Sequence, residues 1–250
     1  MIYSIRGWLT NKESAPFKMQ LHYENPQAGA TACYNGNISE WAWQQGTDAE
    51  LLYGFTYDNV NRLKEISHKK KSGGSWVANA NHYLEKGITY DGNGDILTLQ
   101  RTGNGSLIFN LAQSYIGNQF IGESYDANGN RTSSNGMHYT YNLLGLQDKV
   151  YQTNANILKA QYDYLSNGVK LGLRDGNSST GYDYDGKFIY SFKNGILSLD
   201  LVTFVDGQLT ANGVKYALTD HLRNIRALVD DGGTVLERHD YYPFGGICHH

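Results

Sequence analysis

A five-residue pattern recurs six times along the chain and constrains its fold more than any other feature. Each copy begins with Tyr, and the copies start at Tyr3, Tyr57, Tyr90, Tyr125, Tyr141 and Tyr164. The fifth position of each copy is Gly or Asn: Gly7, Asn61, Gly94, Gly129, Gly145 and Gly168. Gly and Asn enter the left-handed backbone region at the least cost. We therefore expect each copy to reverse the chain in a β-hairpin.

In three of these copies the Tyr is followed by Asp (Asp58, Asp91 and Asp126). The stretches 91–95 (DGNGD) and 126–130 (DANGN) then begin like the calcium loop of an EF-hand. The next position should be Gly, but it holds Ile96 or Arg131, and neither loop has Glu at position twelve. Asp and Asn side chains in such loops commonly bond their own backbone. We therefore favour turns over cation sites, and the sequence predicts no metal and no cofactor.

Aromatic residues also alternate at period two, which places them on one face of a strand. Tyr53, Phe55 and Tyr57 form one such row, and the triplets at 139–141, 162–164 and 182–184 have Tyr at both ends. From Tyr57 onward the copies are 33, 35, 16 and 23 residues apart, which is too irregular for a solenoid. The predicted fold is all-β: a long, curled antiparallel sheet of irregular hairpins with little or no helix.

Composition excludes several classes of protein. The 250 residues include 20 Tyr and 29 Gly, and the formal net charge of −3 gives no basic surface for nucleic acid. No apolar run approaches the roughly 18 residues of a membrane span, and no export signal is visible. Cys33 and Cys248 lie near opposite ends of the chain, so a single disulfide between them remains open.

Candidate site residues are few. Trp41 and Trp43 could form an exposed platform for sugar rings, but we favour the interpretation that they fill the inner face of the sheet. Cys33 has no recognisable catalytic partner in the sequence. The C-terminal pair His249 and His250 is more typical of a chain end than of a metal site.

The C-terminal stretch from Tyr216 to Gly246 carries the most specific motif. It contains Asp220, His221, Leu222, Asn224 and Arg226, then a hairpin signal, and then Tyr242, Pro243, Phe244 and Gly245. This stretch resembles the repeat-associated core element of RHS proteins, and the Tyr-Asp turns resemble the YD repeats of the RHS and teneurin group. Residues 34–43 are similar to a segment of RHS proteins from Bacteroidetes-type bacteria. The family pattern has Gly where this chain has Arg223, so we expect that turn to be built differently.

The resemblance implies one shell segment over residues 1–250, with 216–246 as the core element. RHS shells are β-hairpin walls around a hollow that holds a C-terminal toxin, and they are exported for competition between bacteria. The expected function is therefore that of a non-enzymatic shell fragment for encapsulation and delivery of a toxin cargo that this chain does not include. The alternatives are a cell-surface adhesion module that binds glycans through exposed Trp and Tyr, and a self-cleaving aspartyl protease core.

Two further expectations follow from the resemblance. Family members that cut themselves do so near a D-P-x-G-L site, which this chain lacks, so no catalytic residue is carried over to it. An incomplete shell would expose an aromatic inner face and open sheet edges, so we expect self-association or low solubility.

Overall fold

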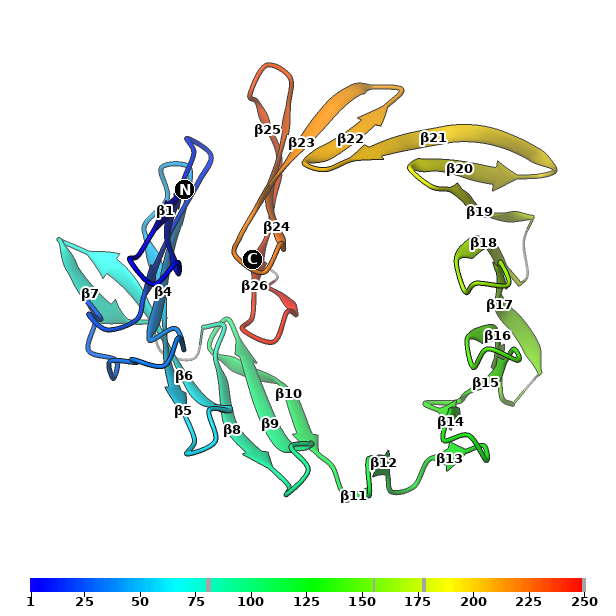
Figure 1. Cartoon of the computed structure of the whole chain (residues 1–250), viewed down its shortest axis with the longest axis horizontal. Helices are drawn as coiled ribbons and strands as arrows, with labels where there is room; N and C mark the ends of the chain where they lie inside the picture. Colours follow the sequence, from blue (N-terminus) through cyan, green and yellow to red (C-terminus); the bar gives the residue numbers. More distant parts are fainter. Residues whose placement is uncertain (80–81, 155, 177–178, 249–250) are drawn as a thin grey trace. The chain divides into compact units, whose positions relative to one another are not determined.

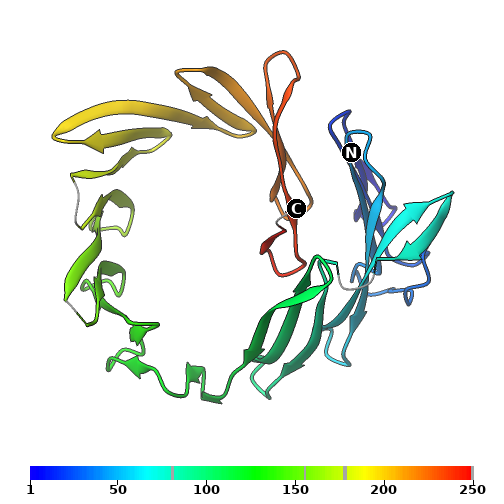
Figure 2. The ribbon, with the colours of Figure 1, turned by 180° about the vertical axis from the view of Figure 1, so that it is seen from behind.

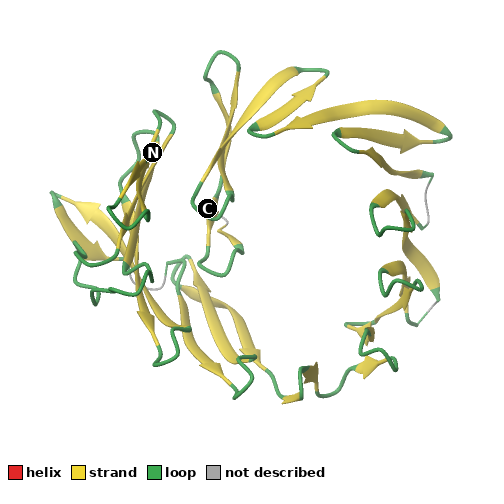
Figure 3. Cartoon of the chain, in the orientation of Figure 1, coloured by secondary structure: helices red, strands yellow, loops and turns green. Residues whose placement is uncertain are grey.

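The structure is a computed structural model that describes residues 1–79, 82–154, 156–176 and 179–248. These residues form antiparallel strands and loops and contain no helix, which confirms the predicted all-β fold (Figure 3). Accordingly, the described ranges hold no helical segment of the length and apolarity needed to cross a membrane. His249 and His250 lie outside the described residues.

The chain divides into two compact units. Unit 1 combines Met1–Ser114 with Ala217–His250, and unit 2 is Tyr115–Tyr216. Unit 1 therefore brings together the first and the last parts of the sequence.

Unit 1 contains a seven-stranded antiparallel sheet in which each strand pairs with the next along the chain (Figure 1). Its strands are β1 (Ile2–Tyr3), β2 (Leu9–Glu13), β3 (Phe17–His22), β4 (Glu40–Gln45), β5 (Leu51–Tyr57), β6 (Leu63–Ser72) and β7 (Ser75–Ala78). A three-stranded sheet follows, with β8 (Glu85–Tyr90), β9 (Ile96–Gly103) and β10 (Ser106–Ala112). β8 lies beside β6, as the view from behind also shows (Figure 2). The last strands of unit 1 are β24 (Ile225–Asp230), β25 (Val235–Arg238), β26 (Asp240–Tyr241) and β27 (Ile247–Cys248).

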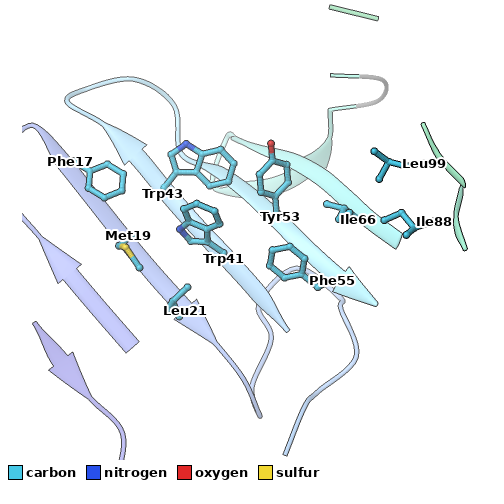
Figure 4. Close-up of a cluster of buried hydrophobic side chains, with 10 residues drawn as sticks. All are labelled: Phe17, Met19, Leu21, Trp41, Trp43, Tyr53, Phe55, Ile66, Ile88 and Leu99. Atoms are coloured by element: carbon cyan, nitrogen blue, oxygen red, sulfur yellow. The ribbon is translucent and has the colours of Figure 1, made fainter. Parts of the chain in front are cut away.

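The hydrophobic core of unit 1 lies on one face of β3 to β6 (Figure 4). Alternate residues point into it, because side chains at i and i+2 share a strand face. The buried set is Phe17, Met19, Leu21, Trp41, Trp43, Tyr53, Phe55, Ile66, Ile88 and Leu99. Met19 is paired directly with Trp43, and Trp41 with Tyr53, so aromatic rings meet across neighbouring strands.

Unit 2 is a succession of antiparallel hairpins. A short ribbon of β11 (Tyr115–Ile116) and β12 (Gln119–Phe120) comes first. A 13-stranded sheet, in which every strand pairs with the next, then runs from β13 to β25. Its unit 2 strands are β13 (Ser124–Tyr125), β14 (Arg131–Ser134), β15 (Met137–Tyr141), β16 (Gln147–Gln152), β17 (Ile157–Tyr164), β18 (Lys170–Asp175), β19 (Thr180–Asp185), β20 (Phe188–Lys193), β21 (Ile196–Phe204), β22 (Gly207–Thr210) and the start of β23 (Gly213–Thr219).

Two kinds of turn recur between these strands. The Tyr-initiated turns are three-residue hairpin loops that end in a left-handed residue. All six fifth positions have the positive φ that the pattern predicts: Gly7 77°, Asn61 66°, Gly94 95°, Gly129 83°, Gly145 71° and Gly168 85°. Asn-Gly pairs make the second kind of turn, at 104–105, 135–136 and 194–195, where both residues have positive φ. This is the signature of the tight type I′ hairpin.

The two cysteines are free. Cys33 is half-buried and Cys248 is buried, so the disulfide that the sequence left open is not formed.

Candidate functional site

The Tyr-Asp loops are closed by their own Asp side chains. The amide of Asp126 donates to the carbonyl of Asn130 (2.9 Å), and Asp126 Oδ1 accepts hydrogen bonds from the amides of Asn128 (2.9 Å) and Asn130 (2.8 Å). The side-chain hydrogen bond from Asn130, followed by these amides, lowers the pKa of Asp126. The oxygens that an EF-hand would direct at a cation are thus engaged with the chain. Across the described ranges, no three His, Cys, Asp or Glu side chains gather closely enough to hold a metal ion.

In three of the six copies, at Tyr90, Tyr141 and Tyr164, the Tyr hydroxyl ties its hairpin to the preceding copy. Tyr90 Oη donates to the carbonyl of Leu63 (2.6 Å), and Tyr164 Oη donates to that of Gln147 (2.9 Å). In both cases the acceptor lies six residues after the Tyr of the preceding copy. The same spacing occurs in the pairs Tyr141–Arg131 and Tyr23–Leu9. Tyr241 Oη donates to the carbonyl of Ile225 (2.9 Å), which lies six residues after Thr219. Tyr57 and Tyr125 are exceptions, because Tyr57 Oη donates to the carbonyl of Ile38 (2.8 Å) and Tyr125 Oη accepts from the amide of Phe120 (2.9 Å).

The C-terminal element begins with a turn of this kind. Asp220 Oδ1 accepts from the amides of Leu222 (2.9 Å) and Asn224 (3.0 Å), and the Asn224 side chain donates to Asp220 Oδ2 (3.1 Å). Arg223 takes the left-handed position with φ of 66°. The expectation of a different turn is therefore wrong, since Arg223 adopts the conformation that Gly would have adopted.

Arg226 on β24 is the centre of the element. Its side chain is fully buried, and its guanidinium lies 5.3, 5.0 and 5.2 Å from the ring centroids of Phe17, Trp41 and Trp43. The guanidinium forms an ion pair with Asp240, and its Nη1 lies 3.9 Å from Asp220 Oδ2. A buried cation needs both a carboxylate and polarisable neighbours, and the aromatic core supplies the second.

Asp240 joins this ion pair to the N-terminal sheet. Trp43 Nε1 donates to Asp240 Oδ1 (2.9 Å), and Gln45 Nε2 donates to the carbonyl of Arg226 (3.1 Å). Trp41 and Trp43 are only 3% and 2% exposed. They therefore belong to the core, as the favoured interpretation has it, and the alternative that they form an exposed sugar platform is wrong.

The closing motif is anchored at a second point, on β8 and β9. Tyr242 Oη donates to the carbonyl of Thr102 (2.7 Å), and the amide of Phe244 donates to Glu85 Oε2 (3.0 Å). Arg101 bonds Glu85 Oε1 (2.5 Å) and lies 4.6 Å from the Tyr242 ring. Burial raises the pKa of Glu85, while the hydrogen bond from Arg101 acts in the opposite direction.

The C-terminal element is thus anchored at two points, the first of which is the ion pair of Arg226 with Asp240. Of the predicted core-motif residues, Asp220, Asn224 and Arg226 lie at this first anchor. His221 packs edge-on against Trp41, with ring centroids 4.9 Å apart. Tyr242 and Phe244 lie at the second anchor, next to Pro243 and to Gly245, which has φ of 86°. The side chain of Leu222 is 61% exposed, and its backbone amide donates to Asp220 Oδ1. Asp240, Gln45, Glu85 and Arg101 were missed by sequence reasoning, because no local pattern marks them.

Two titratable side chains near these anchors, Cys248 and His68, are uncharged at neutral pH. Burial raises the pKa of the Cys248 thiol to about 12, which keeps it protonated, and a thiol in that form is a poor nucleophile. Burial also lowers the pKa of His68 to about 4, so at neutral pH this imidazole is uncharged where it stacks on Trp43. The contacts at the two anchors fasten the C-terminal element to the N-terminal sheet and to β8 and β9.

Unit 2 differs from unit 1 in its packing. Among its described residues only Ser134 and Gly172 are buried, so it has no hydrophobic core of its own. A sheet normally covers one face with a second layer of structure. Unit 2 supplies one layer only.

The fold of the chain is similar to that of solved Tc toxin components. No family model matches the sequence, and no curated protein matches it. Among solved structures, the chain is similar to the Photorhabdus luminescens Tc holotoxin pore with the mutation TccC3-D651A (TM-score 0.62, 12% identity, 99% of this chain and 15% of that chain). It is also similar to TcdB2-TccC3 without its hypervariable C-terminal region (TM-score 0.66, 12% identity, 99% of this chain and 16% of that chain).

These likenesses support the RHS-like fold that the sequence motifs predict. The chain spans only about a sixth of the length of the chains it matches.

Proposed function

We propose that this chain is a non-enzymatic segment of an RHS-type toxin shell, which serves to encapsulate and deliver a C-terminal toxin. The observation that carries the proposal is the single-layer sheet of unit 2, in which every described residue except Ser134 and Gly172 is at least partly exposed. A wall that surrounds a polypeptide needs one open face for its contents. The fold shared with Tc toxin components supports the same function.

The structural role of the C-terminal element fits this proposal. Through Arg226 and Asp240 it fastens to the N-terminal sheet, and through Tyr242 and Phe244 it fastens to β8 and β9. A segment that closes a wall must resist being pulled away, and a buried ion pair within an aromatic core is costly to separate. We assign these residues to closure, and we assign none of them a catalytic role.

Adhesion to glycans receives less support. The residues on which that alternative depended, Trp41 and Trp43, are covered by Arg226 and by neighbouring rings. By analogy with the toxin components that share its fold, we propose that the protein acts after export from a bacterium, with the toxin as its partner.

Binding of a non-native polypeptide tests the proposal. The purified chain should bind a fluorescently labelled, reduced and carboxymethylated α-lactalbumin, measured by fluorescence anisotropy, and it should not bind the same protein in its native, disulfide-bonded form. Equal binding of both forms, or binding of neither, would contradict a role in holding unfolded cargo.

A further inference from the structure

The strands β20 to β23 of unit 2 have one face that is apolar throughout. Strand pairing defines this face, because directly paired residues point to the same side of a sheet. Tyr190 pairs with Leu199, Val202 with Leu209, and Leu209 with Val214. With the alternation along each strand, the face comprises Phe188, Tyr190, Phe192, Leu197, Leu199, Val202, Phe204, Gly207, Leu209, Val214 and Tyr216. We call this set the β20–β23 face; none of its members is charged or carries a side-chain amide. Asp200 has no paired residue, because the register shifts between Leu199 and Leu201, and it is not counted in this face.

The opposite face of the same strands is mixed and largely polar. Ser191 pairs with Ser198, and Gln208 pairs with Lys215. These strands thus have one polar face and one apolar face, and neither face is covered by other described residues of unit 2. Such a difference is expected where only one side packs against another layer.

The β20–β23 face also has a polar border. On β19, Asp183 pairs with Tyr190 and Gly181 pairs with Phe192, so the apolar surface ends at this strand. Arg174 forms an ion pair with Asp183 (2.6 Å) and lies 4.5 Å from the Phe192 ring. An apolar centre with a charged rim is the usual anatomy of a protein–protein interface.

The exposed area is sufficient for a dimer. Six of its side chains are between 37% and 53% exposed: Phe188, Leu197, Leu199, Phe204, Leu209 and Tyr216. If each exposes roughly 80 Å², the six together expose about 500 Å², so two copies facing each other would bury about 1,000 Å². This is at the lower end of specific interfaces and above the usual size of crystal contacts.

We propose that the isolated chain forms a homodimer in which the β20–β23 faces of two copies pack against each other. A two-fold interface brings the same patch together with itself, so a face without charges is self-complementary. Two sheets packed in this way lie about 10 Å apart, as in a β-sandwich, and each supplies the second layer that the other lacks. The sequence predicted self-association from an exposed aromatic inner face and open sheet edges, and the contact proposed here is made through a face. This inference does not depend on the proposed function.

Sedimentation equilibrium between about 1 and 100 μM tests the inference with two variants of adjacent residues. Leu199→Asp places a charge on the β20–β23 face, and Ser198→Asp places the same charge on the opposite face of the same strand. Both side chains are exposed, so neither variant should unfold the chain, and circular dichroism checks this. We expect a dimer for the wild type and for Ser198→Asp, and a dissociation constant at least tenfold weaker for Leu199→Asp.

A wild-type chain that remains monomeric at 100 μM would overturn the inference. So would a dimer that Leu199→Asp leaves intact, or one that both variants weaken equally. A dimer that fails to form while carboxymethylated α-lactalbumin still binds would separate this inference from the proposed function, because the second would then stand without the first.

Discussion

Replacement of Arg226 by Met removes the cation at the centre of unit 1 while retaining most of the side-chain volume. The buried Asp240 then loses its ion pair with Arg226, and the contacts of the guanidinium with Trp41 and Trp43 are lost. Removing one partner of a buried ion pair costs about 3–5 kcal/mol. We therefore expect Arg226→Met to lower the free energy of unfolding of unit 1 by about that amount.

Urea unfolding followed by tryptophan fluorescence is the appropriate assay. The four tryptophans, at positions 8, 41, 43 and 76, all lie in unit 1, so the signal reports on that unit alone. Arg238→Met is the matched control, because Arg238 lies near Arg226 in sequence but pairs with Asp48 on the surface, with side chains 44% and 64% exposed. An exposed pair is worth less than about 1 kcal/mol.

The double variant Arg226→Met/Asp240→Asn sharpens the test. If the cost comes from the buried negative charge of Asp240 that Arg226 no longer offsets, neutralising Asp240 should recover part of it, and the two substitutions will not be additive. Equal losses for Arg226→Met and Arg238→Met would refute the reasoning, and so would strict additivity in the double variant.

Three further predictions concern single residues. Arg223→Gly relieves a left-handed φ of 66° and should stabilise unit 1 by about 0.5–1 kcal/mol in the same urea assay; a loss of stability would count against strain at that turn. Tyr164→Phe removes the hydrogen bond to the Gln147 carbonyl and should cost about 1 kcal/mol, measured as faster amide exchange in β16 and β17 and not elsewhere. His68, whose pKa falls from 6.5 unfolded to about 4 folded, binds fewer protons in the folded state between these values. Stability should therefore decrease as pH falls from 6.5 to 4, by about 3 kcal/mol for this group, and His68→Leu should flatten the profile over this range; an unchanged profile would contradict the assignment.

The turns could be predicted because their causes are local. A left-handed φ at Gly94, Gly129 or Gly168 depends on that residue and its neighbours, so six positions could be identified from one sequence pattern. The Asn-Gly pairs were a missed signal of the same local kind, and they would have located three more hairpins. The hydrogen bonds from Tyr90, Tyr141 and Tyr164 to the preceding copy could also have been sought, since their acceptors lie at a constant position in the repeat.

The anchors of the C-terminal element could not be predicted from local patterns. Gln45 and the Arg226 carbonyl that it contacts are 181 residues apart in sequence, and Trp43 and Asp240 are 197 apart. Strand alternation placed Trp41 and Trp43 on one face, but it could not say whether that face was covered. Trp41 and Trp43 are covered by Arg226, and arginine is a residue type that is rarely buried, so no sequence pattern indicated it there. For the same reason the sequence did not show that unit 2 has no core.

Unit 1 has a hydrophobic core joined to β24 through Arg226, whereas the described residues of unit 2 form a single layer without a core. Hydrogen exchange measured by mass spectrometry along a urea gradient tests this difference most directly. At chain concentrations too low for association, peptides from β14 to β19 should become exchangeable at lower urea than those from β3 to β5. Peptides from β24 should open together with β3 to β5, because Arg226 joins them. Simultaneous opening of both units, or opening of β24 before β3 to β5, would contradict the account.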